Sequence, residues 1–304
     1  MNRRIYSGLL IALLVSLFAS LYLSEAVQAA TAQNKAEPSL SQLGSTAGAC
    51  LAIAHRGASD AAPDNTAAAF RKAGKAGFWG AEADVRPTKN GVLVCLHNQT
   101  ADAMTNGRGY VYSKKWSAVK KYRIDAGRNW RKYDPQHICS FSEFLDICKR
   151  FHMVAVIDIK VPSEKIVHSK FSEKAVRNMY KMVRKKKMLD QAVFQCSVHE
   201  YLKYVKQESD KAVKEDSTLP KATTWYLAQR ISRKEIRTAK KLGCAGITST
   251  FGVTRSMIAY AHKKRVRVMY YLVTSNAQAK KYRRYKADFL VANRKFSAMF
   301  GRKK

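Results

Sequence analysis

The chain has 304 residues and a net charge of +34, from 56 Lys and Arg against 22 Asp and Glu. A charge of this size is far beyond what solubility requires, and it attracts polyanions. The sequence nevertheless has no nucleic-acid-binding motif and no basic stretch studded with aromatic residues, so we expect no nucleic acid partner. The six cysteines show no metal-ligand spacing, which argues against a zinc site.

The N-terminus has the pattern of an export signal. Arg3 and Arg4 precede an apolar run from Ile5 to Leu23, and Val27-Gln28-Ala29 ends in a small residue suited to cleavage. We therefore predict a signal peptide over residues 1–29 and a protein that is secreted or held in the cell envelope. An uncleaved membrane anchor is the alternative, because about 19 apolar residues can span a bilayer. Residues 30–48, rich in Ala, Ser, Thr and Gln, predict a flexible leader.

The remainder, residues 49–304, has the length and pattern of a single barrel domain. Nine apolar or β-branched runs alternate, for the most part, with polar segments typical of helices. The expected strands are Leu51–His55, Gly80–Arg86, Val92–His97, Val154–Lys160, Ala192–Ser197, Thr224–Ala228, Gly246–Ser249, Val266–Val273 and Phe289–Ala292. This alternation predicts an α/β fold, a (β/α)8 TIM barrel, whose typical length the domain matches.

Two features add to the regular barrel. Asn90-Gly91 predicts a tight hairpin, which accounts for the ninth strand because a two-residue turn makes an antiparallel neighbour. Residues 99–136 are long for one connection and rich in Tyr, Trp, Arg and Lys. We expect them to form a small inserted segment at the rim of the active site, where substrate is selected.

Acidic side chains and histidines gather between Ala54 and Asn98. Glu82 and Asp84 are two residues apart in an expected strand, so both carboxylates leave the same face. If Asn90 and Gly91 are the two central residues of a type I′ turn, Lys89 pairs with Val92 and Asp84 lies directly opposite His97. The hairpin alone then brings a carboxylate pair and an imidazole to one place.

A second pair of charged residues follows the same spacing later in the chain. Asp158 and Lys160 also share one face of an apolar strand. Carboxylates on a buried strand need neutralisation, usually by a divalent cation, and oxygen ligands favour calcium or magnesium over zinc. Asp158 and Lys160 are thus candidates for a third metal ligand and a phosphate contact. The alternative is a buried ion pair that closes one end of the barrel.

These segments resemble a known family. The motifs His55-Arg56-Gly57, Pro63-Asp64-Asn65-Thr66, Glu82-Ala83-Asp84, His97-Asn98 and Asp158-Ile159-Lys160 are similar to those of the glycerophosphodiester phosphodiesterases, of the bacterial, exported type. The resemblance covers nearly everything from Leu51 to Phe296 and weakens toward the C-terminus. It implies that the chain hydrolyses glycerophosphodiesters to sn-glycerol 3-phosphate and an alcohol.

The resemblance also implies a role for each matching residue. His55 and His97 would be the catalytic acid and base, and Arg56 and Lys160 would bind the substrate phosphate. The metal, Ca²⁺ or Mg²⁺, would have three carboxylate ligands. These ligands are Glu82, Asp84 and Asp158, and the supporting residues are Asp64, Asn65, Asn98 and Tyr271.

Several positions depart from the family pattern. Asp64 and Asp158 each stand where the family has a glutamate, which shortens the side chain. Asn90 and Asn98 each replace an aspartate, and Ala292-Asn293 stands at a late Thr-Asp. The late tryptophan of the family corresponds to Tyr271. The losses at Asn98 and Asn293 permit another reading, a catalytically weakened envelope protein that binds polyanions.

The positive charge suggests which substrates and partners suit an exported enzyme of this kind. Polymers of glycerol phosphate, such as teichoic acids, are one candidate, and an anionic membrane surface is another. An alternative activity is that of a phospholipase-D-like enzyme on lysophospholipids or sphingomyelin, which would need an apolar rim for acyl chains. Simple adhesion to an anionic wall, or adaptation to an acidic or salty niche, also accounts for the charge.

Overall fold

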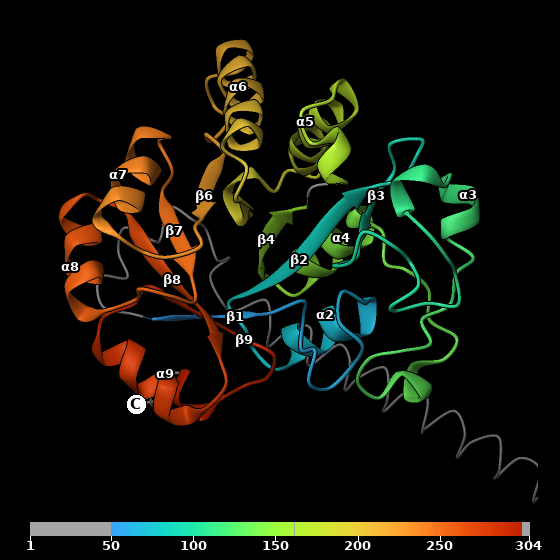
Figure 1. The fold of residues 1–304 in the computed structure, drawn as a ribbon, viewed down its shortest axis with the longest axis horizontal. Helices are drawn as coiled ribbons and strands as arrows, with labels where there is room; N and C mark the ends of the chain where they lie inside the picture. The colour runs from blue at the N-terminus through green and yellow to red at the C-terminus, as the bar shows by residue number, and fades with distance from the viewer. Residues whose placement is uncertain (1–49, 161, 300–304) are drawn as a thin grey trace, which may run out of the picture. The chain divides into compact units, whose positions relative to one another are not determined.

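Eight parallel strands form a closed barrel in the computed structural model, which describes residues 50–160 and 162–299 (Figure 1). The strands pair in chain order and β9 returns to β1, which also pairs with β2. The barrel strands are β1 (Leu51–Ala54), β2 (Gly80–Pro87), β4 (Val154–Ile159), β5 (Ala192–Cys196), β6 (Thr223–Leu227), β7 (Gly246–Ser249), β8 (Arg267–Val273) and β9 (Phe289–Ala292). The predicted TIM barrel is confirmed.

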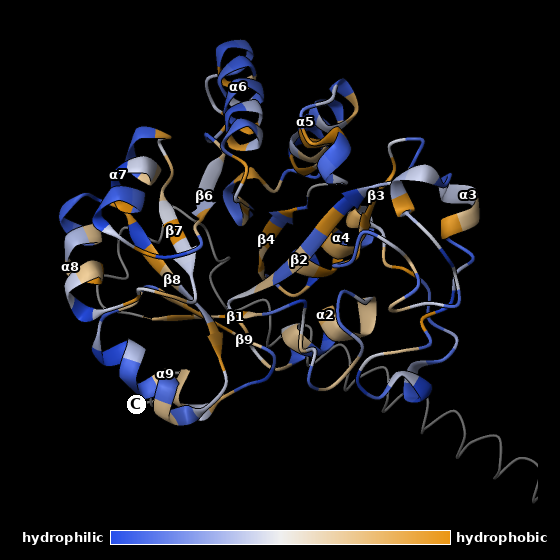
Figure 2. Ribbon diagram, viewed as in Figure 1, coloured by the Kyte–Doolittle hydropathy of each residue, from blue (hydrophilic) through white to orange (hydrophobic). Residues whose placement is uncertain are grey.

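Amphipathic helices connect the strands and cover the barrel. They are α2 (Ala67–Lys75), α4 (Phe141–Arg150), α5 (Lys170–Lys185), α6 (His199–Glu215), α7 (Arg233–Lys241), α8 (Arg255–Lys263) and α9 (Asn276–Arg284). All of these except α6 begin with a Ser or Thr whose side chain accepts a hydrogen bond from a backbone N–H of the first turn. Hydrophilic residues colour much of the helical surface (Figure 2). Local capping thus starts most helices, and burial of their apolar stripe holds them on the barrel.

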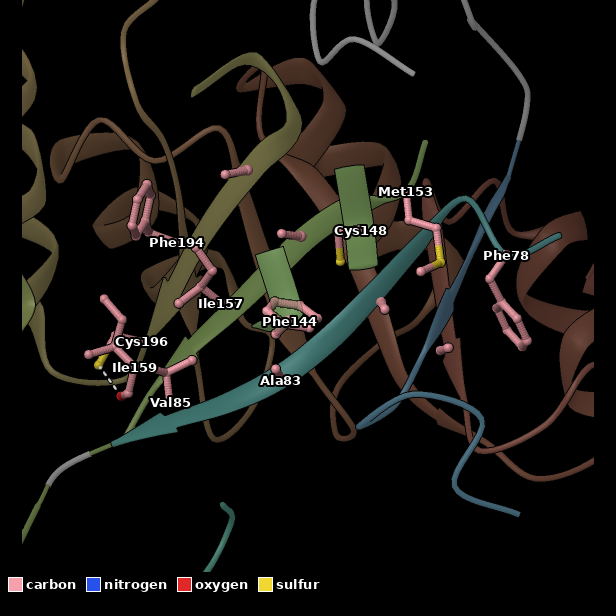
Figure 3. Close-up of a cluster of buried hydrophobic side chains, with 14 of the residues drawn as sticks. Phe78, Ala83, Val85, Phe144, Cys148, Met153, Ile157, Ile159, Phe194 and Cys196 are labelled. Carbon is pink, nitrogen blue, oxygen red and sulfur yellow. Dashed lines mark hydrogen bonds between the residues drawn. The ribbon is translucent and has the colours of Figure 1, made fainter. Parts of the chain in front are cut away.

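Alternate residues of each strand supply two separate apolar layers. Ala83 and Val85 of β2 and Ile157 and Ile159 of β4 point outward, toward helices such as α4 (Figure 3). The inner cluster fills the barrel itself and contains Ile53, Val154, Val156, Val193, Trp225, Met269, Phe289 and Val291. Because the side chains alternate, the even-numbered residues of β2 and β4 belong to the barrel interior.

A short ninth strand, β3 (Leu93–Cys95), pairs antiparallel with β2, as expected, but in a different register. Val85 pairs with Cys95, so Asp84 lies opposite Leu96, and the predicted pairing of Asp84 with His97 is wrong by one residue. The loop has three residues instead of two: Gly91 N–H donates to Thr88 O at 2.9 Å, and Gly91 has φ +81°. A turn followed by a left-handed glycine adds one residue to the loop, which shifts the register.

The segment between β3 and α4 contains the predicted rim insertion, and we call residues 99–136 the rim segment. It includes η2 (Val111–Ser113), α3 (Trp116–Val119) and η3 (Trp130–Tyr133). Outside the rim segment, the described chain has three more short 3₁₀ helices, η4 (Glu164–Ile166), η5 (Leu189–Gln191) and η6 (Ser297–Met299). Four apolar residues of the rim segment pack with Val94, Leu96 and Ile138 from either side of the segment in one small cluster, and these four are Ala101, Val111, Val119 and Ile124. The segment is therefore a packed structure beside the barrel.

The predicted signal peptide (1–29) and leader (30–48) lie outside the described residues. Among the residues that are described, none of the helices combines the length and the hydropathy needed to cross a bilayer.

The filling of the barrel depends on Gly246, which pairs with Trp225 on the neighbouring strand. A Cβ at Gly246 would lie 2.6 Å from the indole atom Cε2 of Trp225. We expect Gly246→Ala to lower the free energy of unfolding by about 1–3 kcal/mol, the usual cost of overpacking, in urea denaturation. In a Trp225→Leu background the cost should be smaller, and equal costs in the two backgrounds would show that the contact with Trp225 is not the cause.

Candidate active site

Three buried carboxylates meet inside the barrel at the carboxyl ends of β2 and β4. Asp84 of β2 is the direct neighbour of Asp158 on β4, and Glu82 lies two residues before Asp84 on the same face. One ligand oxygen from each of the three carboxylates lies within 4.8 Å of the others. The register between these two parallel strands, which the sequence did not specify, therefore unites the two acidic motifs.

Two cations partly neutralise this carboxylate cluster of Glu82, Asp84 and Asp158. Lys160 Nζ lies 2.7 Å from Asp158 Oδ2 and 3.0 Å from Asp84 Oδ1. Arg56 Nε lies 3.1 Å from Asp84 Oδ2, and its backbone N–H donates to Glu82 Oε2 at 2.8 Å. Arg56 and Lys160 thus pair directly with the cluster, and the charge of buried Arg86 also acts on Asp84 and Asp158.

The pKa values follow this charge balance. Burial, reinforced by the charges of Asp84 and Asp158, raises the pKa of Glu82 well above its usual value. Burial also raises the pKa of Asp158, although Lys160 opposes the rise. Burial acts on Asp84 too, but Lys160 and Arg56 together hold its pKa below the usual value. The protein's own cations therefore outweigh burial at Asp84 but not at Glu82 and Asp158, whose negative charges they compensate only in part.

This shortage fits a divalent cation. The three side chains offer hard oxygen donors of the kind that calcium and magnesium take, with no sulfur or imidazole donor in the group. In the part of the chain that the structure describes, this is the one group of three or more His, Cys, Asp or Glu side chains close enough to share an ion. Asp158 reaches the cluster although it is one methylene shorter than the glutamate expected there.

The loop after β1 presents Arg56 to the cluster through an unusual backbone. Arg56 and Gly57 both have left-handed φ angles, +53° and +78°, and a Cβ at Gly57 would lie 2.6 Å from the backbone of Ala69. Asp64, the shorter replacement of a glutamate, still holds Arg56 Nη1 at 2.9 Å. The loop thus fixes the guanidinium beside the carboxylates.

Asn65 ties the same loop to Asp84. Its amide donates from Nδ2 to Asp84 Oδ2 at 2.7 Å, and its Oδ1 accepts from the backbone N–H of Asp84 at 3.0 Å. Asn65 has φ +57°, a left-handed conformation that asparagine tolerates better than most residues. The predicted supporting residues Asp64 and Asn65 therefore both lie at the site.

His55 follows β1 and has an amide, not a carboxylate, as its partner. Its Nδ1 lies 2.6 Å from Asn293 Oδ1, and its ring packs edge-on against Tyr271 with 4.9 Å between ring centroids. An amide oxygen can only accept, so Nδ1 carries the proton and Nε2 keeps its lone pair. Burial, with the nearby charge of Arg56, lowers the pKa of His55 to about 4. His55 is thus a neutral imidazole at pH 7.

His97 reaches the cluster without being the cross-strand partner of Asp84. Leu96, the residue before it, is that partner and donates from its backbone N–H to Asp84 O at 2.8 Å, so His97 follows directly after the residue paired with the cluster. Its Nδ1 lies 2.9 Å from Asn98 Oδ1. The second histidine, like the first, therefore has an asparagine where the family pattern has an aspartate.

Two residues at the site were not among the predicted site residues. Asn293 had been identified only as a departure from the family pattern, whereas the structure makes it the partner of His55. Arg86, buried in the barrel, donates from Nε to the carbonyls of Leu96 and His97 at 2.9 and 3.1 Å. Period-two spacing from Glu82 and Asp84 would have placed Arg86 on the same face.

An asparagine also takes over the work of an aspartate in the β2–β3 turn. Asn90 Oδ1 accepts from Thr88 Oγ1 at 3.0 Å and from the backbone N–H of Trp116 at 2.9 Å. Both bonds need only an acceptor oxygen, so the amide replaces the carboxylate without loss of the turn. This departure affects the hairpin and its contact with α3, not the charge of the site.

A parallel barrel with carboxylates, histidines and cations at the carboxyl ends of its strands defines a class of site suited to phosphate ester chemistry. The model of the Glycerophosphoryl diester phosphodiesterase family matches residues 55–295. The chain belongs to this family, as its motifs suggested.

Individual relatives agree with this assignment. Glycerophosphodiester phosphodiesterase 1 of Mus musculus is 35% identical over 130 residues, which are 42% of this chain and 38% of that protein. The glycerophosphodiester phosphodiesterase of Caldanaerobacter subterraneus subsp. tengcongensis is also 35% identical over 130 residues, 42% of this chain and 51% of that protein. The matched region thus spans about half, or less, of these curated relatives.

Solved structures share the fold at low sequence identity. An Oleispira antarctica phosphodiesterase, in complex with the product sn-glycerol-3-phosphate, has a TM-score of 0.68 and 21% identity, covering 80% of this chain and 92% of that one. A glycerophosphodiester phosphodiesterase from Agrobacterium tumefaciens has a TM-score of 0.64 and 18% identity, covering 81% and 96%. At these identities the likeness supports the fold alone.

The contact between His55 and Asn293 predicts how His55 titrates. Asn293→Asp would put a carboxylate beside Nδ1 and stabilise the imidazolium, so we expect the pKa of His55 to rise from about 4. NMR titration of ¹³C-labelled histidine in EDTA measures the shift, with His55→Gln to assign the signal. The matched Asn98→Asp variant should leave the His55 titration unchanged. An unshifted His55 signal in Asn293→Asp would refute the contact.

The carboxylate cluster predicts stabilisation by divalent metal. Calcium or magnesium that binds only the folded chain should raise Tm, by an amount equivalent to about 2.7 kcal/mol at 100 times Kd. Glu82→Gln should abolish most of this rise, while Glu215→Gln, at an exposed position on α6, should keep it. Differential scanning calorimetry with and without EDTA makes the comparison. An equal rise in both variants would place the metal elsewhere.

Proposed function

We propose that this chain is a metal-dependent phosphodiesterase that hydrolyses glycerophosphodiesters to sn-glycerol 3-phosphate and an alcohol. The observation that carries the proposal is the arrangement of His55 and His97 around one carboxylate cluster that also holds Arg56 and Lys160. Membership of the Glycerophosphoryl diester phosphodiesterase family supports the substrate class. So does the sn-glycerol-3-phosphate bound in the Oleispira antarctica structure.

The cations bind and orient the substrate phosphate. Arg56 and Lys160 each contact the cluster and each remain partly exposed, with about a fifth of the side chain accessible. Their positive charges stabilise the negative charge that builds on the phosphoryl oxygens in the transition state. A divalent metal on Glu82, Asp84 and Asp158 would add charge neutralisation at the phosphate and lower the pKa of a bound hydroxyl.

The histidines move the protons. His55 Nε2, unprotonated at neutral pH, takes the proton of the attacking hydroxyl as that oxygen bonds to phosphorus. His97 donates a proton to the alkoxide as its bond to phosphorus breaks. The attacking oxygen belongs either to water or to the neighbouring glycerol hydroxyl. In the second case, a cyclic phosphate forms and water then opens it.

The asparagine partners favour a working enzyme over a degraded one. Asn293 and Asn98 each present a side-chain oxygen to a histidine Nδ1 and thereby hold a proton on that nitrogen, which leaves Nε2 to take or give the proton of the reaction. They orient the rings as an aspartate would, but they stabilise an imidazolium less, because they carry no charge. We therefore expect turnover that is slowed, not abolished, by these departures.

The surface favours small or polyanionic substrates over acylated ones. Among the described residues, the exposed large hydrophobic side chains are Tyr110 and Phe251, at 47% and 62% exposure. These give little apolar surface for an acyl chain, which argues against lysophospholipids and sphingomyelin. We also propose that the N-terminal segment exports the chain, and this, together with the net charge of +34, leads us to include glycerol-phosphate polymers among the substrates. Ca²⁺ and Mg²⁺ both suit the oxygen ligands.

Release of sn-glycerol 3-phosphate from glycerophosphocholine tests the function. We expect the full chain to release it with calcium or magnesium and to stop when EDTA is added. His55→Ala should lower kcat/KM by at least about 100-fold, the lower range for loss of a general base. The control is His137→Ala, which removes an exposed histidine directly after the rim segment and should keep full activity. Equal release by wild type and His55→Ala would contradict the assignment.

A further inference from the structure

The end of the rim segment packs against the loop that carries the phosphate-binding arginine. Asn129 Nδ2 and Tyr133 Oη both donate to the carbonyl of Ala61 at 3.2 Å. Gly127 lies against Pro63, since a Cβ at Gly127 would be 3.2 Å from Pro63 Cβ. Pro63 directly precedes Asp64, the carboxylate that holds Arg56. Residues 127–133 therefore border the candidate active site at the carboxyl end of the barrel.

Residues 127–133 carry three exposed cations, Arg128, Arg131 and Lys132. None of the ion pairs between described residues involves them. Elsewhere on the surface, Arg177 and Arg184 of α5 pair with glutamates of α6. We call Arg128, Arg131 and Lys132 the rim cations. Their positive charge is available to an external anion.

The backbone around the rim cations is a defined turn. Gly127 and Asn129 have left-handed φ angles of +87° and +57°, and the N–H of Lys132 donates to Asn129 O at 2.9 Å. The guanidinium of Arg131 lies 4.7 Å from the ring centroid of Trp130, a cation–π distance. The three charges are thus held on one short, tethered turn, which lowers the entropy cost of binding.

We infer that the rim cations form a second phosphate subsite, which binds a flanking phosphodiester of a glycerol-phosphate polymer while another is cleaved. The inference rests on the proposed function. A monomeric glycerophosphodiester has one phosphate, which Arg56 and Lys160 already bind, so it leaves the rim cations unused. A polymer engages both sites. The subsite therefore makes the enzyme prefer polymeric over monomeric substrates, and part of the net positive charge serves to bind substrate.

The test removes the rim charges and compares the result with an equal loss elsewhere. The rim variant is Arg128→Gln/Arg131→Gln/Lys132→Gln. The matched control is Lys234→Gln/Lys240→Gln/Lys241→Gln, three exposed lysines of α7, on the opposite side of the barrel from the rim segment (Figure 1). Steady-state kinetics are measured on poly(glycerol phosphate) and on glycerophosphocholine. Polymer binding is measured separately, at several salt concentrations, in the His55→Ala background.

We expect the rim variant to raise KM for the polymer about tenfold and to leave kcat/KM for glycerophosphocholine within about twofold. For polymer binding by the rim variant, the slope of log Kd against log salt concentration should be smaller by about 1 to 2, because fewer phosphates are neutralised. The control should change neither substrate's kinetics by more than about twofold. Circular dichroism and Tm check that the rim variant is folded.

Three results would overturn the subsite. Equal effects of the rim and control variants on the polymer would show a general field and no site. Unchanged polymer kinetics in a folded rim variant would show that the rim cations do not bind the polymer. Loss of oligodeoxynucleotide binding with unchanged polymer hydrolysis would assign the rim cations to nucleic acid. Failure of wild type on both substrates would instead contradict the proposed function, and the binding measurement in His55→Ala would still decide whether the rim cations bind the polymer.

Discussion

The buried carboxylate of Asp84 is the interaction on which the rest of the site depends. It forms ion pairs with Arg56 and Lys160, accepts a hydrogen bond from Asn65, and lies beside Asp158 on the neighbouring strand. Like charges in the barrel interior repel and are costly to desolvate, so each partner must be in place for the others to be tolerated. The left-handed backbone at Arg56 and Asn65 is the local strain that this network holds.

The interior of the barrel has two parts, a lower one at the amino ends of the strands and an upper one at their carboxyl ends, and the lower part offsets the cost of the polar cluster in the upper part. The lower part is apolar and tightly filled, with the indole of Trp225 packed over Gly246 and edge-on to Phe289. The upper part, at the carboxyl ends of β2 and β4, is charged. Packing in the apolar part stabilises the strands. Their fixed register then holds the charged groups at the carboxyl ends closer together than they would lie in water. Stability and chemistry thus use opposite ends of the same strands.

Both histidines illustrate how a departure from a family pattern can preserve geometry while it changes electrostatics. Asn293 and Asn98 supply the acceptor that each Nδ1–H needs, so ring orientation is kept. What is lost is a negative charge beside each ring. For a base that starts neutral this loss is tolerable, since burial and Arg56 already keep His55 unprotonated. For a general acid it is more costly, because an imidazolium needs stabilisation before it can donate.

The sequence by itself was enough for the barrel class and for placing Glu82 with Asp84, and Asp158 with Lys160, on common strand faces, because period-two spacing and short motifs are local properties. It was not enough for the β2–β3 register, which a single left-handed glycine shifted by one residue. Nor could it show that Asn293 meets His55, 238 residues away, or that Arg86 holds the carbonyl of His97. Such contacts depend on barrel closure and on the shape of the turns. Only the tertiary structure decided them, because distance along the chain does not determine distance in space.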